Sequence, residues 1–258
     1  MAYSFVKDQM KTTVCADRAE LGALAGNLAA DFIRRAIADR GEARVIFAAA
    51  PSQNETLAAL VAAEGIDWAK VVALHMDEYV GLPIGSKARF SRYLKDHIFE
   101  KVPFKAIYYI DEERGEGVDA LISRYEKILA EGPVDLVCMG IGENGHVAFN
   151  DPPVADFRDP KAIKLVELDD VCRRQQVNDG CFPDFDSTPS SALTLTVPSL
   201  ARGAARVCAV PGKLKAGAVK KTLEDPVSEA CPATILRTLP NSFLFVDADS
   251  FSETNEPS

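Results

Sequence analysis

The sequence predicts an α/β protein with a doubly wound, mostly parallel sheet that carries helices on both faces. Short apolar runs alternate with amphipathic segments along the chain, which is the pattern of strands and covering helices. The 258 residues suffice for one large α/β domain, and 47% apolar with 26% charged residues is typical of a globular protein. No repeat or linker divides the chain, so we expect a single domain over residues 1–258.

The elements follow in order. Apolar residues at Leu21, Leu24, Leu28 and Phe32 predict a helix over 18–40 that ends before Gly41. Ser52, with Glu55 three residues later, has the spacing of a capping box and predicts a helix start there. The further predicted helices cover 52–65, 88–102, 118–132 and 212–225, and the predicted strands cover 43–50, 70–76, 106–111, 134–142, 162–168, 191–197, 205–211 and 241–249.

Charge and composition exclude several classes of function. The net charge of −9 and the absence of basic runs argue against a nucleic-acid partner. No apolar run approaches the roughly 18 residues of a membrane span, and the N-terminus lacks the apolar core of a signal peptide. Six cysteines without CxxC spacing indicate reduced thiols. We therefore expect a cytoplasmic protein, and the sequence leaves a homo-oligomer open.

Most of the unusual polar residues follow predicted strands. In doubly wound folds, ligands bind beyond the carboxyl ends of the strands. Four polar segments lie at such positions: 51–55, 77–83, 142–153 and 212–215. We expect these four segments to surround one site, with Ser52 and Gln53 in the first of them.

Two segments carry groups suited to acid–base chemistry. Asp77 and Glu78 directly follow a strand, and the carboxylate of Asp77 is either a general base or the cap of a turn. His146 lies in a glycine-rich turn, and Asp151 is close enough in sequence to orient it. Histidine is the side chain that proteins most often use for acid–base chemistry near neutral pH. A structural role for His146 is the alternative.

The same loop matches a GxGxxG pattern at Gly140, Gly142 and Gly145. No helix is predicted after it and it is not in a first βαβ unit, so we reject a dinucleotide site. The three histidines are dispersed and predict no metal site. We expect no metal and no organic cofactor.

Lys215 is predicted in the first turn of a helix, where a cation opposes the helix dipole. A phosphate bound at the helix N-terminus would explain it, and a solvated surface lysine is the alternative. Ser52 likewise binds an anion or simply caps its helix.

The segments "HMDEYVGLP" (75–83) and "GIGENGHVAFNDPP" (140–153), with "SRYLKDHIFEKV" (91–102) between them, resemble the glucosamine-6-phosphate deaminase (isomerase) family. The likeness extends over nearly the whole chain. The same superfamily holds 6-phosphogluconolactonases, which share an "NGH"-type loop but lack a "MDEYVGLP" segment of this form.

The resemblance implies roles for individual residues. Asp77 matches the acid that moves a proton between C2 and C1 of the opened sugar, and His146 matches the histidine that opens the ring. Asp151 stands where the family usually has glutamate, and Asn144 where many members have aspartate. Lys215 matches a lysine that holds the substrate phosphate. Gly142, Gly145 and Glu78 belong to the same two motifs and are expected at the substrate.

This chain departs from the family in two places. The glycine- and threonine-rich phosphate loop is replaced by "AAPSQNE" (49–55), and the lid around 160–185 has Gly180 or Cys181 where the family has a phosphate-binding arginine. We expect Arg173 or Arg174 to substitute. These differences concern the substrate more than the reaction type.

Three functions follow as hypotheses. The first is aldose–ketose isomerisation of an amino-sugar phosphate with release of ammonia. The second is hydrolysis of a phosphorylated sugar lactone, in which His146 activates water and Asp77 is dispensable. The third is a sugar-phosphate-binding protein without turnover.

Overall fold

The computed structural model describes residues 2–83, 85–111, 115, 117–178 and 180–255. The strands are β1 (Tyr3–Lys7), β2 (Met10–Cys15), β3 (Ala43–Phe47), β4 (Val71–His75), β5 (Asp77–Tyr79), β6 (Ala106–Tyr108), β7 (Leu136–Met139), β8 (Ile163–Glu167), β9 (Ser191–Leu195), β10 (Ala205–Val210) and β11 (Ser242–Asp247). The α-helices are α1 (Arg18–Arg40), α2 (Asn54–Ala62), α3 (Phe90–Leu94), α4 (Val118–Ala130), α5 (Asp170–Asn178), α6 (Val197–Ala201), α7 (Ala216–Glu224) and α8 (Ala248–Phe251).

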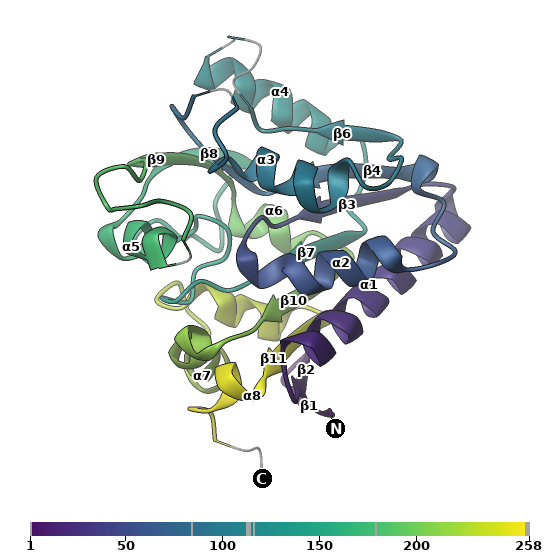
Figure 1. Cartoon of the computed structure of the whole chain (residues 1–258), viewed down its shortest axis with the longest axis vertical. Coiled ribbons are helices and arrows are strands. Elements are labelled where there is room, and N and C mark those ends of the chain that lie inside the picture. Colours follow the sequence, from purple (N-terminus) through teal and green to yellow (C-terminus); the bar gives the residue numbers. More distant parts are fainter. Residues whose placement is uncertain (1, 84, 112–114, 116, 179, 256–258) are drawn as a thin grey trace.

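Eight strands form one large sheet in the order β1-β2-β11-β10-β7-β3-β4-β6 (Figure 1). All neighbouring pairs are parallel except β1 and β2, which are antiparallel. The predicted fold class, a doubly wound and mostly parallel sheet with helices on both faces, is confirmed. β1 and β2 were not predicted, because their short, polar-interrupted runs give little periodic signal.

A second, smaller sheet has the order β5-β9-β8 and is antiparallel throughout. Two of its strands, β8 and β9, are the predicted strands 162–168 and 191–197, which pair with each other instead of extending the large sheet. β5 begins directly after β4, so the small sheet continues from the carboxyl end of a strand of the large one.

Residues alternate between two cores on opposite faces of the large sheet. In β3, Val45 and Phe47 face a core shared with α1, α2 and α3, whereas Ile46 faces the core that holds α4, α6 and α7. Figure 1 shows α1, α2 and α3 in front of the sheet. Strands buried on both faces explain the continuous apolar runs of the sequence.

The helix predicted over 18–40 has the predicted bounds, but one of its predicted core positions differs. Its buried residues include Ala25 and Ala29, whereas Leu24 is exposed. A Cβ atom on Gly22 would lie 2.3 Å from Glu55 Cβ, so only a small residue lets α1 approach α2 this closely. Leu21 is buried, and Leu28 and Phe32 pack against the core, so of the four apolar positions only Leu24 lies off the buried face.

The predicted helix start at Ser52 is also wrong in detail. A 3₁₀ turn covers Pro51–Gln53, and α2 begins at Asn54 without a side-chain cap. Glu55, the expected second half of the capping box, instead pairs with Arg18 at 2.9 Å. The Ser52 hydroxyl is therefore not used as a helix cap.

The strand order reverses between β3 and β7. The chain moves outward from β3 through β4 to β6, returns to β7 beside β3, and then continues on the other side to β10 and β11. Such a switch point leaves a crevice at the carboxyl ends of the two central strands, where α/β proteins bind ligands. Residues 48–53 follow β3 and residues 140–151 follow β7, as the predicted site requires.

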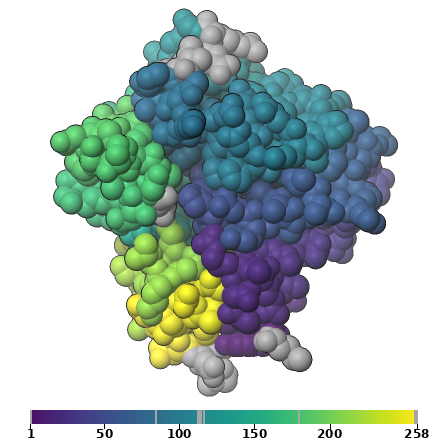
Figure 2. All heavy atoms as spheres, viewed as in Figure 1, coloured from purple at the N-terminus to yellow at the C-terminus, as the bar shows by residue number. Residues whose placement is uncertain are grey.

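The predicted lid, residues 160–185, contains β8, α5 and the start of the loop that leads to β9. Figure 2 shows this part of the chain in green as a lobe at the left of the molecule. All six cysteines are free thiols. Within the described ranges, no helix combines the length and apolar character that a bilayer crossing requires.

Candidate active site

A cavity opens at the switch point and is lined by residues from the four predicted segments and from the lid. It encloses about 650 Å³, part of which is open to solvent. Its polar lining residues are Ser52, Gln53, Asp77, His146, Gln175, Gln176 and Lys215. The expectation that the four segments meet at one site therefore agrees with the described structure.

Asp77 is the first residue of β5 and lies at the cavity with its side chain mostly buried. Burial, and secondarily the nearby charge of Glu78, raise the pKa of the Asp77 carboxyl well above its ordinary value. Its backbone is held in register by pairing with Thr194 of β9. A carboxylate with a raised pKa is a stronger base than an exposed one, as proton abstraction from carbon requires.

His75 fixes the backbone of Asp77 by a hydrogen bond to its carbonyl. Its Nε2 accepts a hydrogen bond from the Ile110 amide at 2.7 Å, so Nδ1 carries the proton and donates to the Asp77 carbonyl at 3.0 Å. Complete burial lowers the pKa of His75 to about 3, so the ring stays neutral. His75 is a positioning residue and not a catalytic acid or base.

His146 lines the cavity and is oriented by two side chains of its own loop. Its Nδ1 lies 2.9 Å from Asp151 Oδ1 and 2.8 Å from Asn144 Oδ1. Both neighbours are oxygen acceptors, so Nδ1 carries the proton and Nε2 keeps its lone pair. Asn144 Nδ2 donates to Asp151 Oδ1 at 2.7 Å, which closes a network of three side chains.

Burial alone would raise the pKa of Asp151, but hydrogen bonding and charge from His146, together with the hydrogen bond from Asn144, hold it below its ordinary value. Asp151 is therefore ionised when His146 takes up a proton. A carboxylate at this position stabilises an imidazolium when one forms.

Two glycines of this loop are sterically required. A Cβ atom on Gly142 would lie 2.1 Å from the His146 ring, so the ring folds back onto the loop only above glycine. Gly145 has φ +87° and faces the Cys231 thiol, which a Cβ atom would meet at 2.5 Å. Gly142 lines the cavity, whereas Gly145 acts through the loop conformation.

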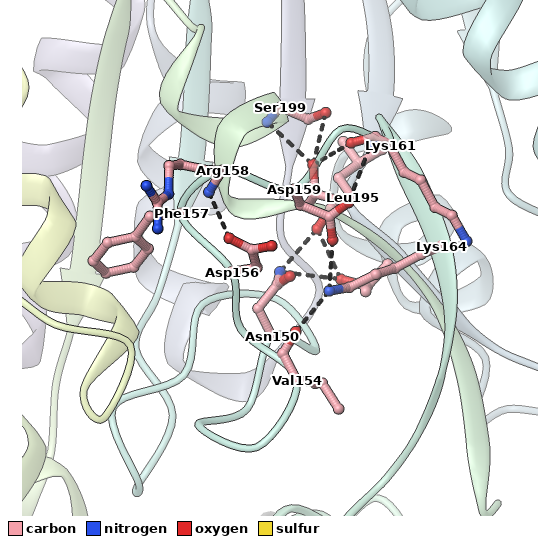
Figure 3. A network of polar contacts seen from close by, with 12 residues as sticks. Asn150, Val154, Asp156, Phe157, Arg158, Asp159, Lys161, Lys164, Leu195 and Ser199 are labelled. Carbon is pink, nitrogen blue, oxygen red and sulfur yellow. Dashed lines mark hydrogen bonds and ion pairs between the residues drawn. The ribbon is translucent and has the colours of Figure 1, made fainter.

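The loop of residues 140–151, which carries His146, is named the catalytic loop. Asn150 anchors this loop to the small sheet (Figure 3). Its Nδ2 donates to the carbonyls of Val147 and Leu195 at 2.9 and 2.8 Å, and the side chain is fully buried. Lys164 of β8 donates to the Val154 carbonyl and to Asp159, which follow this loop. Sequence reasoning did not select Asn150, although it lies within the recognised motif.

We expect Asn150→Ala to lower kcat by about 10- to 100-fold while KM changes little, because the loop that carries His146 loses its anchor. Stability should fall by about 1–3 kcal/mol, since two buried carbonyls lose a donor. Steady-state kinetics and thermal unfolding measure both effects. Asp156→Ala is the matched control, because the Asp156 carboxylate is exposed and accepts from the nearby Arg158 amide. Equal losses in the two variants would contradict an anchoring role.

Lys215, Ser52 and Gln53, which the sequence predicts to bind an anion, also line the cavity. Lys215 is the last residue of a 3₁₀ turn that leads into α7, and its side chain is buried against the cavity. Gln53 Nε2 donates to Ser52 Oγ at 3.1 Å and to the Ala209 carbonyl at 3.1 Å. Lysine, hydroxyl and the first amides of α2 together can hold a phosphate.

Two of the predicted site residues lie elsewhere. Glu78 Oε1 accepts from the amide of Phe90 and Oε2 from that of Ser91, so the buried carboxylate caps the start of α3 and is outside the cavity lining. Neighbouring strand residues point to opposite faces, which separates Glu78 from Asp77.

Arg173 is also outside the cavity lining. Its guanidinium donates to the carbonyls of Phe185 and Thr188 and stacks on the Phe185 ring, so it holds the lid loop together. Arg174 lies over the same ring. The expected substitution for a phosphate-binding arginine is therefore not seen in this arrangement.

The lid instead presents Gln175, Gln176 and Cys181 to the cavity. Gln175 Oε1 accepts a hydrogen bond from the Glu143 amide at 2.8 Å, which joins α5 to the catalytic loop. Sequence reasoning missed these residues, because the lid was predicted without a helix and no helical face was assigned.

The fold and the site together define a doubly wound α/β enzyme with a high-pKa carboxylate, a histidine–carboxylate pair and a lysine at its switch point. Residues 16–243 match the family described as glucosamine-6-phosphate isomerases/6-phosphogluconolactonase. The chain belongs to this family, and the resemblance found in the sequence is confirmed.

Curated relatives include two glucosamine-6-phosphate deaminases. The protein from Bacillus cytotoxicus is 34% identical over 191 residues, covering 74% of this chain and 71% of the relative. The protein from Bacillus thuringiensis (strain Al Hakam) is 36% identical over the same shares of both chains.

Solved structures agree with the fold. A monomeric glucosamine-6-phosphate deaminase superposes with a TM-score of 0.83 at 26% identity, covering 94% of this chain and 99% of that one. The 6-phosphogluconolactonase from Trypanosoma brucei has a TM-score of 0.75 at 17% identity, covering 98% of this chain and 100% of that one, and shows the shared fold alone.

Proposed function

We propose that this protein isomerises and deaminates an amino-sugar phosphate, converting glucosamine 6-phosphate to fructose 6-phosphate and ammonia. The observation that carries the proposal is the presence of two separate acid–base groups on one cavity. Asp77 is a buried carboxylate with a raised pKa, and His146 is backed by an ionised Asp151. The names of these relatives and of the matching deaminase structure support the same activity.

The first step is ring opening. His146 Nε2 takes the proton of the anomeric hydroxyl, the C1–O5 bond breaks as the C1 aldehyde forms, and the imidazolium delivers the proton to the ring oxygen O5. Asp151 stabilises the transient imidazolium through Nδ1, and Asn144 keeps both groups in place.

The second step moves a proton along the carbon chain. Asp77 removes the C2 proton, which the neighbouring carbonyl and ammonium groups make acidic, and the ammonium group passes a proton to O1 as the enolamine forms. Asp77 then returns the proton to C1, which leaves an iminium group at C2. Water adds to C2 and ammonia departs, giving the ketose. The chain's own residues supply both proton transfers.

The direct test measures ammonia and fructose 6-phosphate from glucosamine 6-phosphate with the purified full chain. Formation of both products in equal amounts supports the proposal. No turnover with any amino-sugar phosphate, together with binding of the same sugars, would instead indicate the sugar-phosphate-binding hypothesis.

Lactone hydrolysis is the second candidate, since lactonases share the fold and belong to the same described family. A lactonase needs no group to move a proton from C2, so a buried carboxylate at the position of Asp77 favours the deaminase. Hydrolysis of a phosphorylated sugar lactone that survives Asp77→Asn would reverse this preference.

Lys215→Ala is expected to raise KM for the phosphorylated substrate by about 10- to 100-fold with a smaller effect on kcat, because a charge-assisted hydrogen bond to phosphate is lost. Lys213→Ala is the matched control: Lys213 lies in the same 3₁₀ turn, but its side chain is exposed and bonds to Ser252. An unchanged KM in Lys215→Ala would show that the phosphate binds elsewhere.

A further inference from the structure

Three buried side chains, those of His146, Asp151 and Cys172, bring atoms of the kinds that bind metals close together. One ligand atom each of His146, Asp151 and Cys172 lies within 4.8 Å of the other two. The three residues are 7%, 2% and 0% exposed, respectively. His146 and Asp151 come from the catalytic loop and Cys172 from α5 of the lid, so the set joins two segments that the sequence keeps apart.

The chemistry of the set selects the ion. An imidazole nitrogen, a carboxylate oxygen and a thiolate sulfur are the ligands that Zn²⁺ prefers, and three protein ligands leave the fourth position to water. Bond lengths of about 2.0–2.3 Å place tetrahedral ligands about 3.5 Å apart. His146 Nδ1 and Asp151 Oδ1, 2.9 Å apart, would open slightly, and a pair at the 4.8 Å limit of the set would close by roughly 1 Å. Mg²⁺ prefers six oxygen ligands and is a poor match.

Asp151 provides an independent indication of a ligand. Its Oδ1 accepts from Asn144 and lies beside His146 Nδ1. Its Oδ2 is buried and meets no regular hydrogen-bond geometry among the described residues, and the Cys172 thiol is the weak donor beside the carboxylate. A buried carboxylate oxygen served only by a thiol is poorly satisfied, and a bound cation would satisfy it better.

We propose that His146, Asp151 and Cys172 form an inhibitory site for Zn²⁺ and chemically similar divalent ions. The ion binds His146 through Nδ1, so the single proton of the neutral ring moves to Nε2. The Cys172 thiol releases its proton to solvent and binds as the thiolate. With Nε2 protonated, His146 no longer accepts the anomeric proton, and ring opening stops.

The position of Cys172 on α5 adds a mechanical effect. Gln175, one turn further along the same helix, already bonds to the Glu143 amide of the catalytic loop. A metal bridge from Cys172 to His146 and Asp151 holds the lid against this loop at a second point. Binding of the ion therefore fixes both the tautomer of His146 and the position of the lid.

Metal binding is tested first, without using catalysis. Co²⁺ replaces Zn²⁺ as a probe and is titrated into the reduced, chelator-treated full chain while its near-ultraviolet thiolate-to-cobalt charge-transfer band is recorded. We expect one equivalent to bind in the wild type, and Cys172→Ser and Cys172→Ala to lose the band. Cys181→Ser is the matched control, since Cys181 is a partly exposed thiol of the same lid, and it should keep the band.

No band in the wild type, or an unchanged band in the folded Cys172 variants, overturns the site. Thermal unfolding confirms that the variants are folded, and the use of both serine and alanine separates a failed fold from a lost ligand. This experiment is independent of the proposed reaction, so it distinguishes failure of the metal site from failure of the proposed function.

Inhibition is the second test and rests on the proposed function. Zn²⁺ should inhibit turnover of the wild type, a chelator should restore it, and Mg²⁺ at the same concentration should have no effect. The Zn²⁺ concentration for half-inhibition should rise by about 10-fold or more in Cys172→Ser. Equal inhibition of wild type and Cys172→Ser, or metal binding without inhibition, overturns the inhibitory role.

Discussion

Asp77→Asn is expected to abolish exchange of the substrate C2 proton with solvent and to lower turnover by at least ~10²–10⁴-fold, the range of general base catalysis. The asparagine fills nearly the same volume at the start of β5, but its amide is not a base. Proton NMR in heavy water follows the exchange, and an ammonia assay follows turnover. Retained exchange in this variant would remove Asp77 from the proposed mechanism.

The pH dependence of the wild type follows from the same residue. The base form of Asp77 is lost as the pH falls through its raised pKa, so kcat/KM should decline on the acid side at a pH well above the 3.8 of an ordinary aspartate. The pH profile of kcat/KM for the free enzyme measures this. A profile that stays flat down to about pH 4 would contradict the raised pKa.

The Asp77→Asn variant should also have a larger free energy of unfolding than the wild type at neutral pH. In the unfolded chain Asp77 ionises near pH 3.8, whereas in the folded protein it ionises at a higher pH. The folded state therefore binds more protons between these values, and stability falls as the pH rises through this window. Asparagine carries no charge, so the variant avoids that loss of stability. Thermal unfolding of the variant and the wild type at pH 7 and at pH 4 tests this, and we expect the variant's gain in stability to be larger at pH 7.

His146→Gln is expected to slow turnover of the closed-ring substrate by about 10²–10⁴-fold, because ring opening loses its base. An open-chain analogue bypasses this step, so its isomerisation by the same variant should be affected far less. The ratio of the two rates is the informative quantity. Equal losses on both substrates would argue against ring opening as the task of His146.

Asp151→Asn is the matched variant for this test. It keeps the shape of the side chain beside His146 Nδ1 but removes the negative charge that stabilises the imidazolium. We expect a smaller loss than in His146→Gln, again confined to the closed-ring substrate. A loss on the open-chain analogue would show that Asp151 supports another step.

The sequence by itself determined the fold class and the core of the site. Strands buried on both faces appear as continuous apolar runs, and polar residues directly after them mark the ligand-binding edge of the sheet. Asp77, His146, Ser52, Gln53 and Lys215 were chosen in this way, and all line one cavity together with Gly142, which was chosen for its motif. Asn144 and Asp151 were chosen for their motif and contact His146 as expected.

Tertiary structure decided which polar groups face the cavity and which support it. Glu78 caps a helix and Arg173 stabilises the lid loop, because each side chain hydrogen-bonds to backbone groups more than ten residues away in sequence. Asn150, His75 and Cys172 acquired their roles through contacts with β9, Ile110 and the catalytic loop. Side-chain direction and long-range contacts are set when strands and helices pack together. A local sequence pattern therefore does not predict them.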